Sequence, residues 1–103
     1  MIHVVAAIQV KPGCRENVIQ AIKENLANVL AEDGCLGYSP AVDIDAGLPP
    51  QGDMREHVIT IVEGWESLAA LHAHLATAHM AAYREKVKDW VEGVDLQVME
   101  VVD

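Results

Sequence analysis

The segment from Met54 to Trp65 reads MREHVITIVEGW, and its apolar side chains occupy both alternating faces of a predicted strand. One face carries Val58, Thr60 and Val62, and the other carries Ile59, Ile61 and Trp65. A strand that is apolar on both faces must be covered on both. In a chain of 103 residues, its own helices can cover one face, and a second subunit is the natural cover for the other. The sequence therefore predicts a sheet with helices on one side and a homodimer.

The first half of the chain predicts a strand, a helix and a second strand. Residues 2–10, IHVVAAIQV, end at a Pro-Gly turn. A helix from Arg15 to about Gly34 follows, because apolar residues recur there at helical spacing. Its stripe is Val18, Ile22, Leu26 and Val29, with Glu24, Asn25 and Asn28 on the other side. Residues 35–44 are predicted as a strand in which Pro40 favours an edge position or a bulge.

The second half predicts a loop over residues 46–53, then the two-faced strand, a broken helix and a last strand. Ser67 and Thr77 are predicted N-caps, with the break at Ala76-Thr77. After Gly93 the apolar residues alternate again. The order strand, helix, strand, strand, helix, strand predicts an α+β fold, the ferredoxin-like βαββαβ arrangement with an antiparallel sheet, as one domain over residues 1–103.

Charge and cysteine content exclude several classes of protein. The formal charge is −9, from 16 acidic and 7 scattered basic residues, so neither nucleic acid nor an anionic membrane is an expected partner. No apolar run approaches the length of a membrane span, and the N-terminal residues lack a basic leader. Cys14 and Cys35 form no C-x-x-C pair. These features predict a cytoplasmic protein with free thiols.

Proton-transfer chemistry is predicted where the two-faced strand meets the next helix. Trp65 is followed by His72, His74 and His79. Imidazole exchanges protons near neutral pH, and an indole offers a flat apolar wall to an aromatic ring. A metal site is not predicted, because helical positions two or seven apart do not bring imidazoles together for chelation.

The whole chain resembles the antibiotic biosynthesis monooxygenase (ABM) family, and in particular its small quinol monooxygenase-like members. The resemblance lies in VVAAIQVKPG, in EDGCLGY at residues 32–38, in VEGWES at residues 62–67 and in HLATAHMAAY at residues 74–83. It implies a dimeric α+β barrel with a pocket between the sheet and the helices of each subunit. It also implies oxidation of quinol-type phenols by O2 with no cofactor: no flavin, haem or metal. The sequence contains neither G-x-G-x-x-G nor a P-loop.

The resemblance also implies the residues of the site. His74 and His79 match family positions, and one of them, in either order, is the predicted catalytic base and the other its orienting group. Predicted substrate contacts are Trp65, Tyr83, Met80 and Tyr38. Each has a structural reading as well: the histidines can cap or pack the helix break, and the aromatic and Met side chains can belong to the core. Glu63 matches the family too, and a structural hydrogen bond to Trp65 is its alternative role.

Three other functions are alternatives to quinol oxidation, and the sequence argues against the first. Haem-degrading relatives use an Asn in the first strand, where this chain has Ala6 and Ala7, which argues against that activity. An isomerase would shuffle protons without O2. A non-catalytic small-molecule-binding or stress-response barrel would use the same pocket without turnover. The leading hypothesis is a cofactor-independent monooxygenase that oxidises a small aromatic quinol or phenol with O2.

Overall fold

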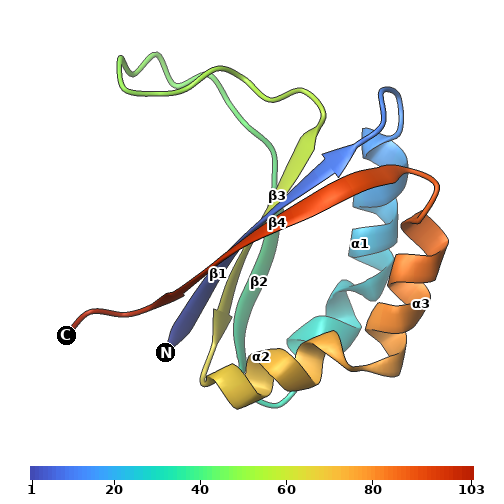
Figure 1. Cartoon of the computed structure of the whole chain (residues 1–103), viewed down its shortest axis with the longest axis vertical. Helices are drawn as coiled ribbons and strands as arrows, with labels where there is room; N and C mark the ends of the chain where they lie inside the picture. The colour runs from blue at the N-terminus through green and yellow to red at the C-terminus, as the bar shows by residue number, and fades with distance from the viewer.

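The computed structural model describes residues 1–103 and contains a four-stranded antiparallel sheet with three helices on one of its faces (Figure 1). The strand order is β2-β3-β1-β4. The predicted ferredoxin-like α+β fold is confirmed, with the second helix divided in two. The elements are β1 (Ile2–Val10), α1 (Arg15–Leu30), β2 (Cys35–Ala41), β3 (Val58–Trp65), α2 (Leu68–Leu75), α3 (Ala78–Val87) and β4 (Val91–Glu100).

Two predicted strands are shorter than expected, and one begins earlier. β2 ends at Ala41 and β3 begins only at Val58. The residues between them are held together by hydrogen bonds of a side chain and not by strand pairing. Asp43 accepts hydrogen bonds from Arg55 Nη2 at 2.8 Å and from the Arg55 backbone N–H at 3.0 Å. This pairing replaces a backbone ladder at the base of the loop. β4 begins at Val91, which pairs with Val10 beyond a bulge.

The core lies between the sheet and the helices. Alternate β1 residues from Ile2 to Val10 are buried, and β3 contributes Ile59, Ile61 and Trp65 to the same face. Cross-strand register places Ile2 opposite Trp65 and Val4 opposite Glu63. α1 supplies Val18, Ala21, Ile22 and Val29, and α3 supplies Met80 and Val87. The helix-facing assignment of Ile59, Ile61 and Trp65 follows their period of two.

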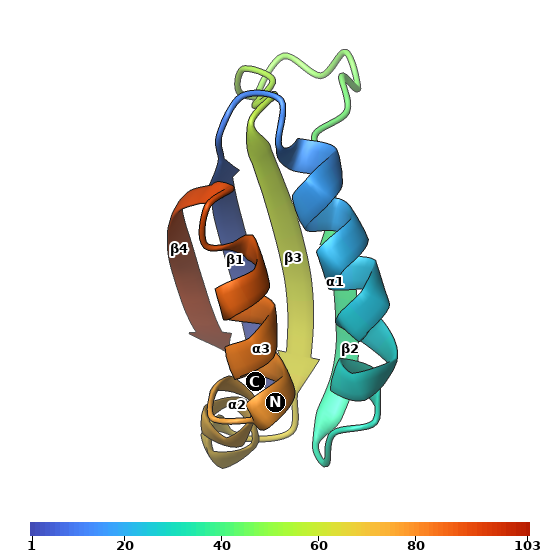
Figure 2. The ribbon, with the colours of Figure 1, turned by 90° about the vertical axis from the view of Figure 1, so that its right-hand side faces the viewer.

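The opposite face of the sheet carries apolar side chains with no helix over them. Val5 of β1 pairs with Val62 of β3, which is 49% exposed. Figure 2 shows α1 and α3 on one side of the sheet, with β4 beyond the edge of the helix layer. Val94, Leu96 and Val98 of β4 pair with Ile8, Ala6 and Val4, so they lie on the helix-side face, and they remain about half exposed because the helix layer does not reach β4. None of the helices has the length and apolar character needed to cross a bilayer.

The predicted caps and the predicted break set the directions of α2 and α3. Ser67 Oγ accepts from the Ala70 backbone N–H at 3.1 Å, and Thr77 Oγ1 accepts from that of Met80 at 3.3 Å. Thr77 also donates its hydroxyl to the carbonyl of His74 at 2.9 Å, which closes the end of α2. Since α3 restarts after this break, His74 of α2 and His79 of α3 approach the same carboxylate oxygen of Glu32.

Gly34 brings the end of α1 against α2. Its φ is +81°, and a Cβ at this position would lie 2.7 Å from the Cβ of Ala70. Only glycine meets both conditions without strain. The Gly34 carbonyl accepts from the Glu66 backbone N–H at 2.8 Å, so the turn that contains Glu32 is held beside the start of α2.

Candidate functional site

One carboxylate joins the two predicted catalytic histidines. His74 Nδ1 lies 2.8 Å from Glu32 Oε2, and His79 Nε2 lies 3.3 Å from the same oxygen. Glu32 follows the end of α1, whereas the histidines come from α2 and α3. His74 is 1% exposed, so this contact forms out of water. His79 Nε2 is also buried but is not aligned for a hydrogen bond, and Glu32 is therefore bound mainly to His74.

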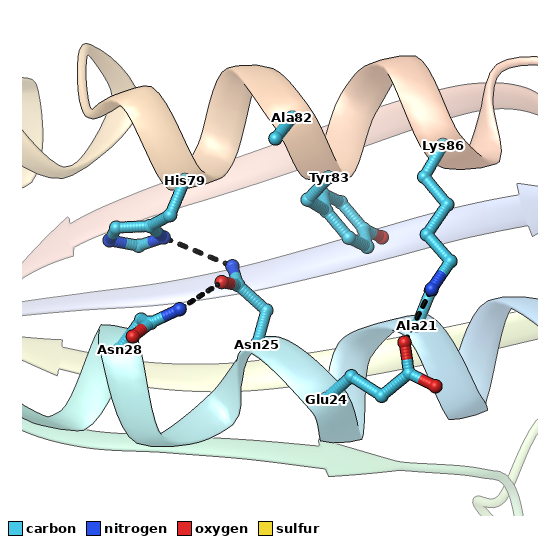
Figure 3. A pocket seen from close by; sticks show the side chains of 8 residues that line it. All are labelled: Ala21, Glu24, Asn25, Asn28, His79, Ala82, Tyr83 and Lys86. Carbon is cyan, nitrogen blue, oxygen red and sulfur yellow. Dashed lines mark hydrogen bonds and ion pairs between the residues drawn. The ribbon is translucent and has the colours of Figure 1, made fainter.

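The hydrogen-bond network indicates which ring nitrogen of each histidine carries the proton. Asn28 Nδ2 donates to Asn25 Oδ1 at 3.0 Å, which directs the Asn25 amide nitrogen to His79 Nδ1 at 3.1 Å (Figure 3). His79 Nδ1 is then an acceptor, and its proton lies on Nε2, facing Glu32. His74 donates from Nδ1 to Glu32. Nε2 of His74 makes no hydrogen bond within the chain and is the free acceptor of the cluster.

Two aromatic rings enclose His74. The ring of Trp65 lies 4.6 Å from that of His74 with an interplanar angle of 35°, and Tyr38 lies at 5.6 Å and 58°. Trp65 is fully buried and donates its indole N–H to Glu63 Oε1 at 2.9 Å. The structural hydrogen bond considered for Glu63 is thus present. It fixes the indole plane against His74.

The interior of the site is apolar and acidic. Burial raises the pKa of Glu63, although the hydrogen bond from Trp65 and the proximity of His74 oppose the shift. Burial also raises the pKa of Tyr38 above its usual range and that of Tyr83 to about 12. Arg84 donates to the Leu75 carbonyl at 3.1 Å at an exposed position. Both tyrosines remain neutral phenols, and Tyr38 lies beside the imidazole that Glu32 supports.

The space between the sheet and the helices differs from the expected pocket. It is a void of about 10 Å³, lined by Ile22, Asn25, Val29, Tyr38, Met80 and Tyr83. A void of this size holds at most one water molecule. The side chains of Tyr38, Met80 and Tyr83 occupy the volume that a pocket would need. A groove of about 230 Å³ lies outside it, between α1 and α3 (Figure 3).

The structure gathers most of the residues predicted for the site. His74, Trp65 and Tyr38 form one contact cluster, and His79 joins it through Glu32. The remaining two, Met80 and Tyr83, line the void. His72 is exposed. No group of three or more His, Cys, Asp or Glu side chains is placed to hold a metal ion.

Sequence reasoning missed Glu32 and assigned Asn25 to the solvent side of α1. Asn25 is instead half-buried and contacts both His79 and Met80. Hydropathy gave no signal for it, because a polar residue at the border of a helical stripe can face either water or another helix. Glu32 had a signal: it opens the EDGCLGY segment that carried the family resemblance.

Fold and site together define a small ferredoxin-like α+β domain with a buried His–Glu pair against a tryptophan. Residues 1–86 match the family model described as "Antibiotic biosynthesis monooxygenase". The chain is 40% identical over 102 residues to the protein named "Probable quinol monooxygenase YgiN" of Escherichia coli K12, with 97% of each chain covered. The chain belongs to the antibiotic biosynthesis monooxygenase family.

Solved structures agree with this assignment. A conserved protein from Bacteroides thetaiotaomicron superposes with a TM-score of 0.78 at 30% identity, covering 97% of this chain and 96% of its own. A protein from Nitrosomonas europaea, titled "Putative antibiotic biosynthesis monooxygenase", gives a TM-score of 0.83 at 19% identity over 100% of both chains. At that identity the second likeness concerns the fold alone.

Proposed function

We propose that this protein is a cytoplasmic, homodimeric monooxygenase that oxidises a small aromatic quinol or phenol with O2 and needs no cofactor. One observation carries the proposal: Glu32 holds the Nδ1 proton of His74, which leaves Nε2 as a free acceptor beside Trp65. The family membership and the quinol monooxygenase name of the E. coli relative support the substrate class.

The proposed reaction begins with proton transfer to His74 Nε2. The resulting quinolate gives one electron to O2, and the radical pair combines into a peroxide with a new C–O bond. The imidazolium returns its proton to the peroxide, and loss of the ring C–H proton then breaks the O–O bond. A quinol and O2 thus yield a hydroxyquinone and water. General-base catalysis of this kind contributes about 10² to 10⁴ in rate.

Glu32 has two tasks in this scheme. Its contact with His74 Nδ1 selects the tautomer that exposes Nε2 as an acceptor. Its negative charge also stabilises the imidazolium that forms when His74 takes the proton, and the effect is strong because His74 is excluded from water. Trp65 supplies the flat wall, held in place by Glu63.

The homodimer is proposed from the uncovered face of the sheet. Val5 and Val62 are paired apolar residues there, and β4 adds Met99 on the same face. A second copy of the chain is the expected cover, since exposed contiguous apolar surface marks an interaction site. Sedimentation at micromolar concentration should give twice the chain mass, and a species of 11.2 kDa would contradict the dimer.

A binding protein without turnover is the second candidate. The observation in its favour is that the hydrogen-bonding and aromatic contacts of the His74 side chain are with Glu32, Tyr38 and Trp65, none of which is a cation that could hold a substrate oxyanion, while the two aromatic rings suit any flat ligand. Tight binding of an aromatic compound with no product would support it.

Oxygen uptake distinguishes these candidates. Purified protein, free of metal and flavin, is mixed with a panel of reduced naphthoquinols and anthrone-like phenols, and autoxidation is subtracted. The double variant His74→Ala, His79→Ala should lose the uptake. His72→Ala is the matched control, because His72 is an exposed histidine of the same helix as His74 and should retain it. Absence of uptake with every compound would contradict the oxygenase.

A further inference from the structure

The void between the sheet and the helices leads toward His74 through Tyr38, which lines the void and whose ring centroid lies 5.6 Å from that of His74. The void of about 10 Å³ is far smaller than a quinol, and Tyr38 and Met80 fill its walls. A ligand that reaches His74 must therefore displace a wall. Ile22, Val29 and Tyr38 belong to the buried core, whereas Asn25 and Tyr83 also line the groove on the outer surface.

The groove between α1 and α3 shares that wall. Asn25 and Tyr83 line both the groove of about 230 Å³ and the void of about 10 Å³. The other large cavities follow the loop between β2 and β3 or lie near Arg15, and they share no residue with the void. The groove is lined by α1 and α3, which lie on one side of the sheet (Figure 2), so a dimer through the opposite face leaves it open.

Tyr83 is the movable part of the wall. Its hydroxyl makes no hydrogen bond within the chain, and its groove neighbours on the two helices include the small residues Ala21 and Ala82 (Figure 3). Rotation of the ring is opposed by burial but by no polar contact. Asn25, by contrast, is held by His79 and Asn28 and forms the fixed side.

The groove has polar ends and an apolar middle. The ion pair of Lys86 with Glu24 spans one end, and the amides of Asn25 and Asn28 lie at the other (Figure 3). Between them are Tyr83 and two alanines. Both members of the ion pair are about half exposed, and exposed pairs of this kind open at little cost. A flat ring with oxygens at opposite ends, as in a para-quinol, matches this order of groups.

We propose that the α1–α3 groove is the entry and first binding site for a flat hydroxylated aromatic ligand, and that Tyr83 is the wall that turns aside to admit it to the space beside His74. The proposal rests on the proposed function for the identity of the ligand. Its test depends on ligand arrival and not on turnover, so the two can fail separately.

The experiment measures how fast 1,4-naphthoquinone quenches Trp65 fluorescence in stopped flow. A Trp90→Phe background leaves Trp65 as the emitter, and quenching by electron transfer reports arrival close to the indole. Ala82→Phe fills the groove, whose lining includes none of His74, Trp65 and Tyr38. Ala81→Phe is the matched control, since Ala81 is an exposed α3 residue outside the groove lining. Far-UV circular dichroism confirms that each variant is folded.

Ala82→Phe should slow association by about tenfold, within the range that variants of one binding site span. Ala81→Phe should leave the rate unchanged, and Tyr83→Ala should raise it. Equal association rates for Ala82→Phe and Ala81→Phe would overturn the proposal, as would slower association in Tyr83→Ala. Absence of quenching in the parent protein would overturn it as well.

Discussion

Removal of the Glu32 carboxylate tests the core of the site through stability. In Glu32→Ala the Nδ1–H of His74 loses its acceptor at 2.8 Å, and His74, at 1% exposure, cannot turn to water. A buried donor left without a partner costs about 1–3 kcal/mol. The longer contact to His79 is misaligned and adds little. We expect the free energy of unfolding to fall by about 2 kcal/mol and the melting temperature by roughly 10 °C.

Urea denaturation at a fixed protomer concentration measures this change, because the stability of a dimer would depend on concentration. Asp33→Ala is the control: the neighbouring carboxylate is exposed, makes no hydrogen bond, and its loss should change stability by at most about 0.5 kcal/mol. A double-mutant cycle with His74→Phe should recover most of the cost, since the stranded donor is then absent. Equal effects of Glu32→Ala and Asp33→Ala would refute the proposed contact.

Three further predictions concern the surroundings of the site. Burial raises the pKa of Glu63 above its value of 4.5 in the unfolded chain, so the folded protein keeps this proton to a higher pH. The free energy of unfolding therefore falls as the pH rises from 4.5 through the pKa of the folded state. Glu63→Gln should remove that part of the pH dependence in urea titrations while keeping an acceptor for Trp65; an unchanged pH profile would contradict it. Gly34→Ala should cost at least about 1–2 kcal/mol by thermal denaturation, given φ of +81° and the approach of Ala70. Thr77→Ala should cost about 1 kcal/mol through the lost cap of α3, and no change in melting temperature would argue against that cap.

Local sequence patterns predicted the sheet and the helix break. Alternation placed Ile59, Ile61 and Trp65 on one face of β3, and the hydroxyls of Ser67 and Thr77 marked two helix starts. These features depend on a few neighbouring residues, so the sequence contains them directly. The end of β2 could not be predicted in this way, because it depends on an ion pair between Asp43 and Arg55 across a loop.

The site could be predicted only in part, for the same physical reason. Its histidines stood out by residue type, but their shared partner Glu32 lies 42 positions before His74. Asn25 lies 54 positions before His79, and only the packing of α1 on α3 brings them together. The filled void was not predictable either, since it depends on the rotamers of Tyr38, Met80 and Tyr83.

The measurement that tests the central claim most directly is isotope incorporation from ¹⁸O2. Metal- and flavin-free protein is incubated with a reduced naphthoquinol under ¹⁸O2, and the mass of the product is measured by mass spectrometry. We expect a hydroxyquinone carrying a single labelled oxygen, formed by the parent and by His72→Ala but not by the His74→Ala, His79→Ala variant. An unlabelled product, or equal labelling with the double variant, would contradict a monooxygenase whose proton acceptor is the Glu32-bound histidine.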